Sequence, residues 1–294
     1  MQPDASVKLE RLKLRIVEIG PCVVAFSGGA DSTFLAAVAT SVLGADNVRC
    51  VTAVSPSLAQ SELDDCRKLS DELGLNWHTV DTDEMERAAY GRNDRDRCFH
   101  CKSALMDAVD PIARVFDGVV LLGVNSDDLG DDRPGQIAAA ERGARFPMVD
   151  AGLNKDDVRQ LSRELGVPTW DKPAMACLAS RVPNGIPVTV EVLSRVERAE
   201  AFVRSLGVVG NLRVRHFGGV ACIEADRDQF ADIEARKGEI VEQFRRLGYE
   251  RTVLDLEGFR SGSLNRRDDS AGRSDAGLMT DAGLMSRDLQ DLLS

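Results

Sequence analysis

Short apolar runs alternate with amphipathic stretches through the first half of the chain, a pattern typical of parallel βα units. The apolar runs predict strands at 22–26, 48–54, 77–82 and 118–124. The amphipathic stretches predict helices at 31–43, 59–73 and 100–116, and one more helix that starts after Asn154 as N-cap and ends at Gly166. We therefore expect an α/β domain with a parallel sheet over residues 1–170.

The pattern changes after Trp170. Between Pro168 and Pro187 the chain carries four of its ten prolines, which regular elements do not tolerate, so 171–188 is predicted to be an ordered inter-domain loop. The next elements are expected to be a helix at 189–206, strands at 212–217 and 220–225, a helix at 227–247 and a strand at 251–256. They predict a small α+β domain over 189–265, for substrate binding or oligomerisation.

The segment 266–294 is polar and contains the unit DAGLM twice. Its composition predicts a mostly disordered tail, with a short partner-binding helix as the alternative.

Composition narrows the function. Against 37 Lys and Arg stand 48 Asp and Glu, a net charge of −11 that disfavours an extended nucleic-acid surface. No apolar run reaches the roughly 18 residues that a membrane span needs, and the first residues show no signal-peptide core, so we expect a cytoplasmic protein. The odd number of cysteines, seven, argues against a disulfide framework and leaves free thiols, metal ligands or catalytic thiols.

The stretch VVAFSGGADS passes from an apolar strand through two glycines directly into a helix. Such a turn aims backbone N–H groups and the helix dipole at one point, which favours a phosphate group. Glycines allow a ligand to approach closely, serine hydroxyls add donors, and the aspartate either caps the helix or faces the phosphates through Mg²⁺. We call this predicted phosphate-binding turn the phosphate seat. The residues expected to form it are Ser27, Gly28, Gly29, Asp31 and Ser32.

The turn lacks the lysine that a mononucleotide P-loop places on the terminal phosphates, so it suits pyrophosphate as a leaving group after attack on the α-phosphate. SGGADS resembles the signature of the ATP pyrophosphatase (PP-loop) superfamily. A tight turn without a ligand is the alternative for a bare Gly-Gly pair, and the six-residue match favours the phosphate seat.

Cys98 and Cys101 stand three residues apart at the start of a predicted helix, a spacing that suits metal chelation or a redox pair. Cys177 lies in the proline-bounded loop, where a rigid irregular backbone can present a reactive group. Three thiolates at one centre would hold a 4Fe-4S cluster with one iron open to external sulfide. Four cysteines are expected to be buried and inert: Cys22, Cys50, Cys66 and Cys222.

Six spaced motifs resemble those of the LarE-type sulfur transferases over about residues 8–265: SGGADS, RCFHCK, GVNSDDLGDDRPG, CLASR, RVRHFGGVACIE and DLEGFRSGSLN. The resemblance implies an ATP-dependent enzyme that adenylates the carboxylates of a pyridinium dicarboxylate mononucleotide, releases pyrophosphate and replaces AMP with sulfur. This reaction belongs to synthesis of the nickel-pincer nucleotide cofactor of lactate racemase.

The family has two branches. In one, the cysteine of the CLASR motif gives up its own sulfur and is left as dehydroalanine; in the other, two further cysteines join it to hold an iron–sulfur cluster. With Cys98, Cys101 and Cys177 the chain looks like the cluster branch, and without a cluster Cys177 would be the donor. The implied cofactors are ATP, Mg²⁺ and a 4Fe-4S cluster, and the implied partners are a sulfide donor and further copies of the chain in a homo-oligomer.

The resemblance also implies roles for single residues. For each, the alternative to a functional role is a solvated surface position or a helix cap. Nucleotide binding would extend to Gly123 and Asp128, with Asp127 beside them, at the carboxyl ends of the strands. Ser180 and Arg181 would orient the adenylated intermediate. The residues expected to bind the substrate are Lys102, Glu200, Arg213 and Arg215. The two arginines alternate on a strand and so share one face, which could bind the substrate phosphate.

Three other functions stay open at this point. tRNA thiolation also uses a PP-loop with three cysteines, but it needs an RNA-binding surface that an acidic chain provides poorly. An amide ligase of the NAD-synthetase type would use ammonia and leave the three thiols unexplained. A non-catalytic ATP sensor or cluster carrier would bind nucleotide without releasing pyrophosphate.

Overall fold

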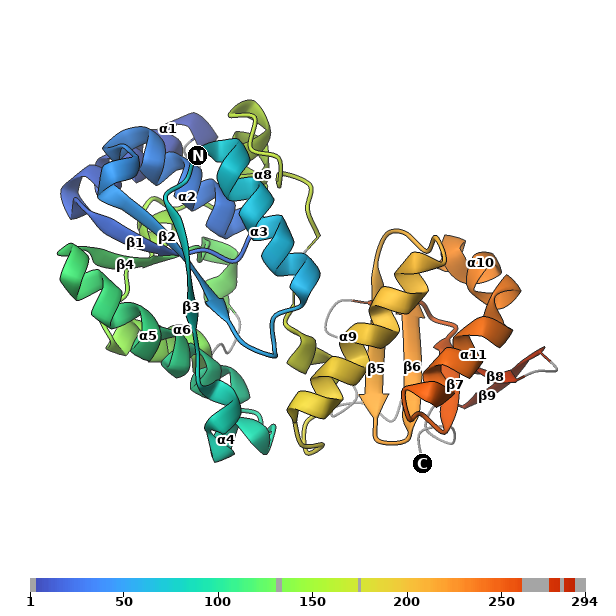
Figure 1. Ribbon diagram of the computed structural model, residues 1–294. Helices are drawn as coiled ribbons and strands as arrows, with labels where there is room; N and C mark the ends of the chain where they lie inside the picture. The colour runs from blue at the N-terminus through green and yellow to red at the C-terminus, as the bar shows by residue number, and fades with distance from the viewer. Residues whose placement is uncertain (1–3, 131–133, 174–175, 261–274, 281–282, 289–294) are drawn as a thin grey trace. The chain divides into compact units, whose positions relative to one another are not determined.

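The computed structural model describes residues 4–130, 134–173, 176–260, 275–280 and 283–288. They form two compact units (Figure 1). The first contains residues up to 91 together with 95–176, and the second contains 92–94 together with the chain from 177 onward. The boundary at residue 176 falls inside the predicted loop 171–188.

The first unit is built on a parallel sheet with the strand order β3-β2-β1-β4. The strands are β1 (Cys22–Ala25), β2 (Val48–Val54), β3 (Trp77–Asp81) and β4 (Val119–Leu122). All four were predicted, and the α/β fold class is confirmed. Because Ala25 pairs with Val51 and with Leu122, the carboxyl ends of neighbouring strands open onto one edge.

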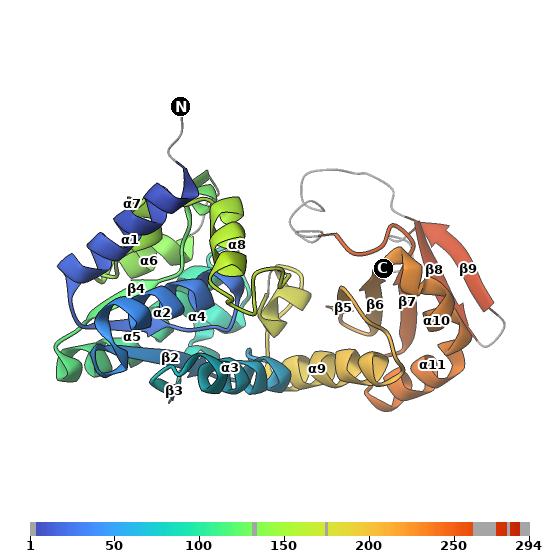
Figure 2. The ribbon, with the colours of Figure 1, turned by 90° about the horizontal axis from the view of Figure 1, so that it is seen from above.

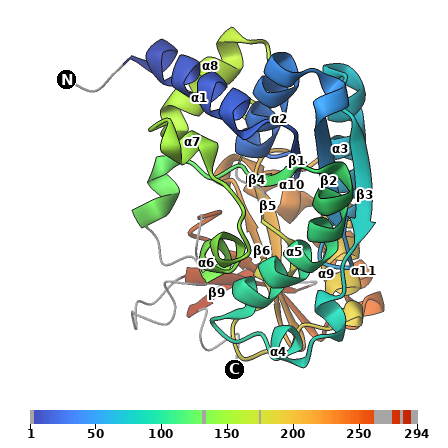
Figure 3. The same ribbon diagram turned by 90° about the vertical axis from the view of Figure 1, so that its left-hand side faces the viewer.

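Helices cover both faces of this sheet (Figure 3). Apolar residues of one face pack on α1 (Ala5–Ile19), α2 (Ala30–Leu43), α3 (Gln60–Leu73) and α8 (Lys155–Glu164). Those of the other face pack on α5 (Arg97–Phe116) and α6 (Pro134–Glu141). Two single-turn helices are α4 (Ala88–Gly91) and α7 (Pro147–Asp150), and 3₁₀ turns lie at η1 (Ala45–Asn47), η2 (Glu84–Glu86) and η3 (Ser126–Gly130). As predicted, Asn154 caps α8, in a reciprocal capping box with Asp157.

The second unit is built on a mixed sheet with the strand order β5-β6-β7-β8-β9, in which β6 and β7 are parallel and the other neighbours antiparallel (Figure 2). Its strands are β5 (Leu212–Phe217), β6 (Val220–Ala225), β7 (Arg251–Asp255), β8 (Asp275–Thr280) and β9 (Gly283–Asp288). Its helical elements are η4 (Leu178–Arg181), α9 (Val190–Ser205), η5 (Arg227–Gln229), α10 (Phe230–Ala235) and α11 (Lys237–Arg246). The buried core joins α9 and α11 to the sheet through residues such as Val203, Val214, Ile223 and Phe244.

Two expectations for this unit were wrong. The single helix predicted at 227–247 is split, because Arg236, with φ −104° and ψ 10°, leaves helical geometry between α10 and α11. Strands occupy 275–280 and 283–288, where disorder was predicted, and β8 pairs with β7. Such pairing satisfies backbone groups through a distant segment, which local composition cannot reveal. The rest of the predicted tail, 266–274, 281–282 and 289–294, lies outside the described residues.

Candidate active site

The predicted phosphate seat is a tight turn between β1 and α2. Gly28 lies in the left-handed region, at φ 67°, and Gly29 is the N-cap of α2. Ser32 ties the turn together, since its Oγ accepts the Ser27 N–H at 3.2 Å and lies 3.0 Å from Ser27 Oγ. The turn thus precedes the positive end of the α2 dipole, a geometry that suits an anion, and phosphate binding by these residues stays a prediction.

Close packing explains the glycines of the seat. A Cβ on Gly28 would lie 2.9 Å from Sγ of Cys66, on α3. A Cβ on Gly123, which follows β4, would lie 2.8 Å from the backbone nitrogen of Ser32. Gly123 thus packs against the first turn of α2, and its part in nucleotide binding stays a prediction.

Two carboxylates share a partner, that of Asp31 in the seat and that of Asp128 in η3. Asn125 links them: its Nδ2 donates to Asp31 Oδ1 at 3.1 Å, and its backbone N–H donates to Asp128 Oδ2 at 3.2 Å. Burial raises the pKa of Asp31; the hydrogen bond from Asn125 opposes this rise and the charge of Asp128 adds to it. Mg²⁺ is usually held by one or two carboxylates together with phosphates and water, so this pair fits the metal. Asp127 instead accepts the N–H of Lys155 at 3.0 Å, at the start of α8.

Cys98 and Cys101 lie in the first two turns of α5, which begins at Arg97. Cys98 is exposed and Cys101 is half-buried, as is the neighbouring Lys102. His100 Nε2 lies 3.1 Å from Oδ2 of the N-cap residue Asp96.

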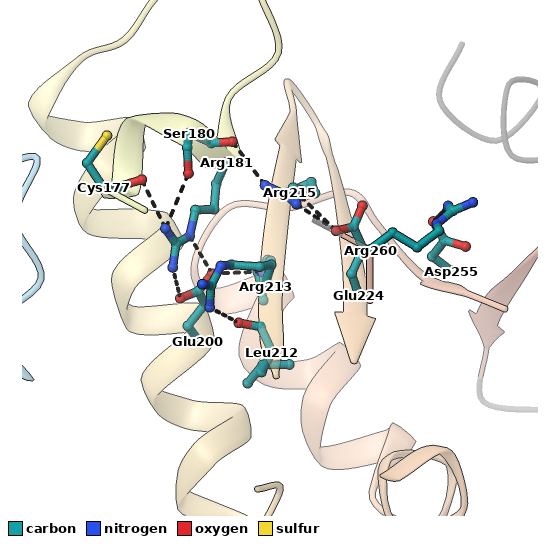
Figure 4. Close-up of polar contacts among 11 residues, drawn as sticks. Cys177, Ser180, Arg181, Glu200, Leu212, Arg213, Arg215, Glu224, Asp255 and Arg260 are labelled. Atoms are coloured by element: carbon teal, nitrogen blue, oxygen red, sulfur yellow. Dashed lines mark hydrogen bonds and ion pairs between the residues drawn. The ribbon is translucent and has the colours of Figure 1, made fainter. Parts of the chain in front are cut away.

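In the second unit, the half-buried Cys177 is the N-cap of η4 (Figure 4). Arg181 closes this turn, because its Nη1 donates to the Cys177 carbonyl at 2.9 Å and to Ser180 Oγ at 3.3 Å. Its Nε and Nη2 donate to the two carboxylate oxygens of Glu200, on α9, at 3.0 and 3.1 Å. Glu200 Oε1 also accepts the N–H of Val214 at 2.9 Å. Hydrogen bonds thus join α9, β5 and η4, the turn that begins at Cys177.

Arg213 and Arg215 come from β5, as predicted, and their surroundings differ (Figure 4). Arg215 is buried: its Nε and Nη2 donate to Glu224 Oε2 at 2.9 and 2.7 Å, and its Nη1 donates to the Ser180 carbonyl at 3.0 Å. The half-buried Arg213 lies 5.5 Å from the centre of the Phe259 ring. Arg215 therefore supports the Cys177 turn, and substrate binding by the two arginines stays a prediction.

The cysteines fall into two groups, as predicted. Cys22, Cys50, Cys66 and Cys222 are buried, whereas Cys98, Cys101 and Cys177 are exposed or half-buried. Burial raises the pKa of both Cys22 and Cys50 to about 12 and also raises that of Cys66. The residues described by the structure include no group of three or more His, Cys, Asp or Glu side chains that could hold a metal ion. Convergence of the three accessible thiols, which are divided between the two units, stays a prediction.

Two residues that contact the phosphate seat were not predicted. Asn125 stands inside the quoted motif GVNSDDLGDDRPG, so the signal was present although the residue was not singled out. Lys172 contacts the carbonyl of Gly28 from a distant part of the first unit, which no local pattern predicts.

Comparison with known proteins agrees with this geometry. Residues 7–107 match the NAD synthase family model. An uncharacterized protein of Synechocystis sp. is 44% identical over 262 residues, which cover 88% of this chain and 97% of the relative. The pyridinium-3,5-bisthiocarboxylic acid mononucleotide synthase of Lactiplantibacillus plantarum is 34% identical over 261 residues, or 88% of this chain and 94% of the synthase. The chain belongs to the LarE-type sulfur transferase family.

Membership in the LarE-type family confirms the resemblance read from the six motifs and the PP-loop architecture of the first unit. As a LarE-type protein the chain is an ATP-dependent enzyme, and ATP and Mg²⁺ suit the glycine seat and its carboxylates. An NH₃-dependent NAD(+) synthetase of Chlorobaculum tepidum is 28% identical over 175 residues, but these cover only 57% of this chain and 62% of the synthetase. The more extensive match favours sulfur transfer over amide ligation.

Within the described residues, no helix combines the length and apolar character needed to cross a membrane.

Proposed function

We propose that this LarE-type enzyme converts both carboxylates of a pyridinium dicarboxylate mononucleotide to thiocarboxylates, at the expense of ATP, for a nickel-pincer nucleotide. The product class is the one named in the L. plantarum relative. The observation that carries the proposal is the position of Cys177 at the head of a turn whose carbonyls are held by Arg181 and Arg215. A thiol on so well supported a turn is presented, not buried, which suits a group that binds or delivers sulfur.

The first step is adenylation. A substrate carboxylate oxygen attacks the α-phosphorus of ATP, the bond to the bridging oxygen breaks, and pyrophosphate leaves with the electron pair. The turn from Ser27 to Ser32 would hold the phosphates by its N–H groups and hydroxyls, and Asp31 and Asp128 would hold Mg²⁺, which neutralises charge on the leaving pyrophosphate.

The second step is sulfur transfer. A sulfide sulfur attacks the acyl carbon, the carbon–oxygen bond breaks, AMP leaves with the electron pair, and a thiocarboxylate remains. We propose that Ser180 and Arg181 orient the adenylate, and that Lys102, Glu200, Arg213 and Arg215 favour binding of the anionic substrate directly or by positioning one another. Glu200 and Arg215 are already engaged with Arg181 and Glu224, which supports the positioning role for these two.

The sulfur source is the finer part of the proposal. Cys98, Cys101 and Cys177 would hold a 4Fe-4S cluster, which when bound supplies an iron open to sulfide from an external donor. Support comes from accessibility, since these three thiols are the ones not buried among the seven cysteines. The seven cysteines, all within the described residues, form no disulfide, which suits a reducing compartment, and we propose that a homo-oligomer acts in the cytoplasm.

The test is an anaerobic assay with ATP, Mg²⁺, the dicarboxylate mononucleotide and excess sulfide as the external sulfur donor, using enzyme with and without reconstitution by iron and sulfide. Mass spectrometry of product and intact chain should show several turnovers of thiocarboxylate per reconstituted chain, with the chain mass unchanged. One product per chain, with loss of H₂S from the chain, would instead identify Cys177 as a consumed donor.

Cysteine variants complete the test. Cys177→Ala should abolish thiocarboxylate formation but not pyrophosphate release, and Cys222→Ala, at a buried position, should retain both. Pyrophosphate release with no thiocarboxylate from the wild-type chain, reconstituted or not, would contradict the proposed function.

A further inference from the structure

Asn93 has an unusual set of contacts for a residue outside the motifs that identify the family. It is fully buried, and at φ 59° it is one of two non-glycine residues with positive φ in the described part of the chain. Its Nδ2 donates to the carbonyls of Val182, Pro183 and Ile186 at 3.2, 2.8 and 2.8 Å. Its own carbonyl accepts the N–H of Gly185 at 3.2 Å.

These contacts answer a need of the loop that follows Cys177. The stretch RVPNGIP contains two prolines, so its backbone cannot pair regularly, yet its buried and half-buried carbonyls require donors. A short side chain with two N–H donors supplies them, on a backbone that must also accept left-handed geometry. Asparagine meets both requirements, whereas glycine lacks the donors and aspartate offers only acceptors when ionised.

Asn93 also stands at a particular place in the chain. Residues 92–94 belong to the second unit, although the residues on both sides of them belong to the first. Cys98 follows five residues later, so chain length alone keeps the two Cα atoms within about 18 Å. On the other side of the contact, Val182 ends the turn that Cys177 begins. The segment leading into the Cys-x-x-Cys helix is thus fastened to the turn that carries the third thiol.

We propose that Asn93 is a positioning residue that holds the Cys98 and Cys101 segment within reach of Cys177. The inference rests on the proposed function, in which the three thiols act together, and extends it to a residue that hydrogen-bonds to the backbone of the loop after Cys177. Under this proposal, Asn93 affects how often Cys98 or Cys101 meets Cys177, and it does not affect ATP binding at the phosphate seat.

The test uses the full-length chain, reduced and free of iron, and a short bis-maleimide that links neighbouring thiols. Peptide mapping should find links from Cys98 or Cys101 to Cys177 in the wild type. In Asn93→Gly, which keeps the left-handed backbone without the donors, and in Asn93→Asp, which keeps the shape, these links should fall at least fivefold. The link between Cys98 and Cys101, within one helix, serves as an internal standard and should not change.

Asp117→Gly is the matched control, because Asp117 is the other described non-glycine residue with positive φ, at 53°. It is the C-cap of α5, the helix that carries Cys98 and Cys101. It should keep all links at the wild-type yield. Iron bound after reconstitution should fall in the Asn93 variants, while ATP binding should not. In the wild type, the amide of Gly185 should be protected from hydrogen exchange, which tests the fastening even where a variant does not fold.

The outcomes separate the two proposals. Undiminished links to Cys177 in both Asn93 variants, or an unprotected Gly185 amide, would overturn the role of Asn93 whatever the iron content. Wild-type links that depend on Asn93 in a chain that binds no iron would support the positioning role and contradict only the cluster.

Discussion

The ammonium group of Lys172 donates a hydrogen bond to the carbonyl oxygen of Gly28, 144 residues earlier in the chain, at 3.2 Å. It also donates to Asp65 Oδ2, on α3, at 2.8 Å. The glycine turn contains no lysine, yet a lysine from elsewhere in the first unit contacts its backbone. Lys172 therefore supports Gly28 in its left-handed conformation and places a positive charge beside the phosphate seat.

Lys172→Met should weaken ATP binding, because the turn loses a charged donor and the triphosphate loses a nearby cation. Loss of one hydrogen bond to a charged group costs about 1.5–3 kcal/mol, which corresponds to roughly a tenfold to hundredfold rise in KM for ATP. Pyrophosphate release at varied ATP measures it. Lys172→Arg should recover part of the loss, and Lys68→Met, at an exposed position on α3, should have no effect. A wild-type KM in Lys172→Met would refute the role.

Gly123→Ala should damage both stability and nucleotide binding. The new Cβ would lie 2.8 Å from the backbone nitrogen of Ser32, so the first turn of α2 must shift, at a cost of about 1–3 kcal/mol for an overpacked site. Gly238→Ala in α11 is the control: its Cβ meets nothing within 4 Å, and alanine in a helix should stabilise by about 0.5–1 kcal/mol. Thermal unfolding and calorimetric titration with ATP measure the two effects. Equal behaviour of the two variants would contradict the packing account.

The sequence predicted the parallel sheet because strands buried on both faces are apolar runs, and Val48–Val54 and Val119–Leu122 have little else in them. The sequence also located the glycine turn, because the residues of such a turn are consecutive in the chain and form a recognisable motif. Pairing between distant segments was not predictable. The strand Asp275–Thr280 is stabilised by its neighbour β7, and Lys172 reaches Gly28 only once the first unit has folded. The partners of Arg215 were hidden likewise, because Glu224 comes from the next strand.

Glu200→Ala should destabilise the second unit, because it leaves the buried guanidinium of Arg181 without its carboxylate. Breaking one partner of a buried pair costs about 3–5 kcal/mol. Replacing both partners together, as Arg181→Met with Glu200→Leu, should restore much of the stability while sulfur transfer stays low, since the Cys177 carbonyl also loses its donor. Urea unfolding of the wild type, Glu200→Leu, Arg181→Met and the double variant, the four chains of a double-mutant cycle, measures the coupling. Strictly additive losses would show that the pair does not act as a unit.

Thiol labelling connects the burial of the cysteines to the question of the sulfur source. The thiolate is the nucleophile, and a pKa of about 12 leaves only about one part in 10⁴ of Cys22 and Cys50 ionised at pH 8, in addition to their lack of access to reagent. Iodoacetamide at pH 8 should therefore label Cys98, Cys101 and Cys177 in the folded, iron-free chain, and all seven cysteines in urea.

After anaerobic reconstitution with iron and sulfide, the three accessible cysteines should become protected together, because thiolates bound to iron are no longer free nucleophiles. Peptide mapping gives the labelled fraction at each position, and Cys66, whose pKa is also raised by burial, should stay unlabelled in both states. Protection of Cys98 and Cys101 with full labelling of Cys177 would mean that iron is held by two thiols alone. The third thiol would then be free to give up its own sulfur, and each chain would make a single sulfur transfer.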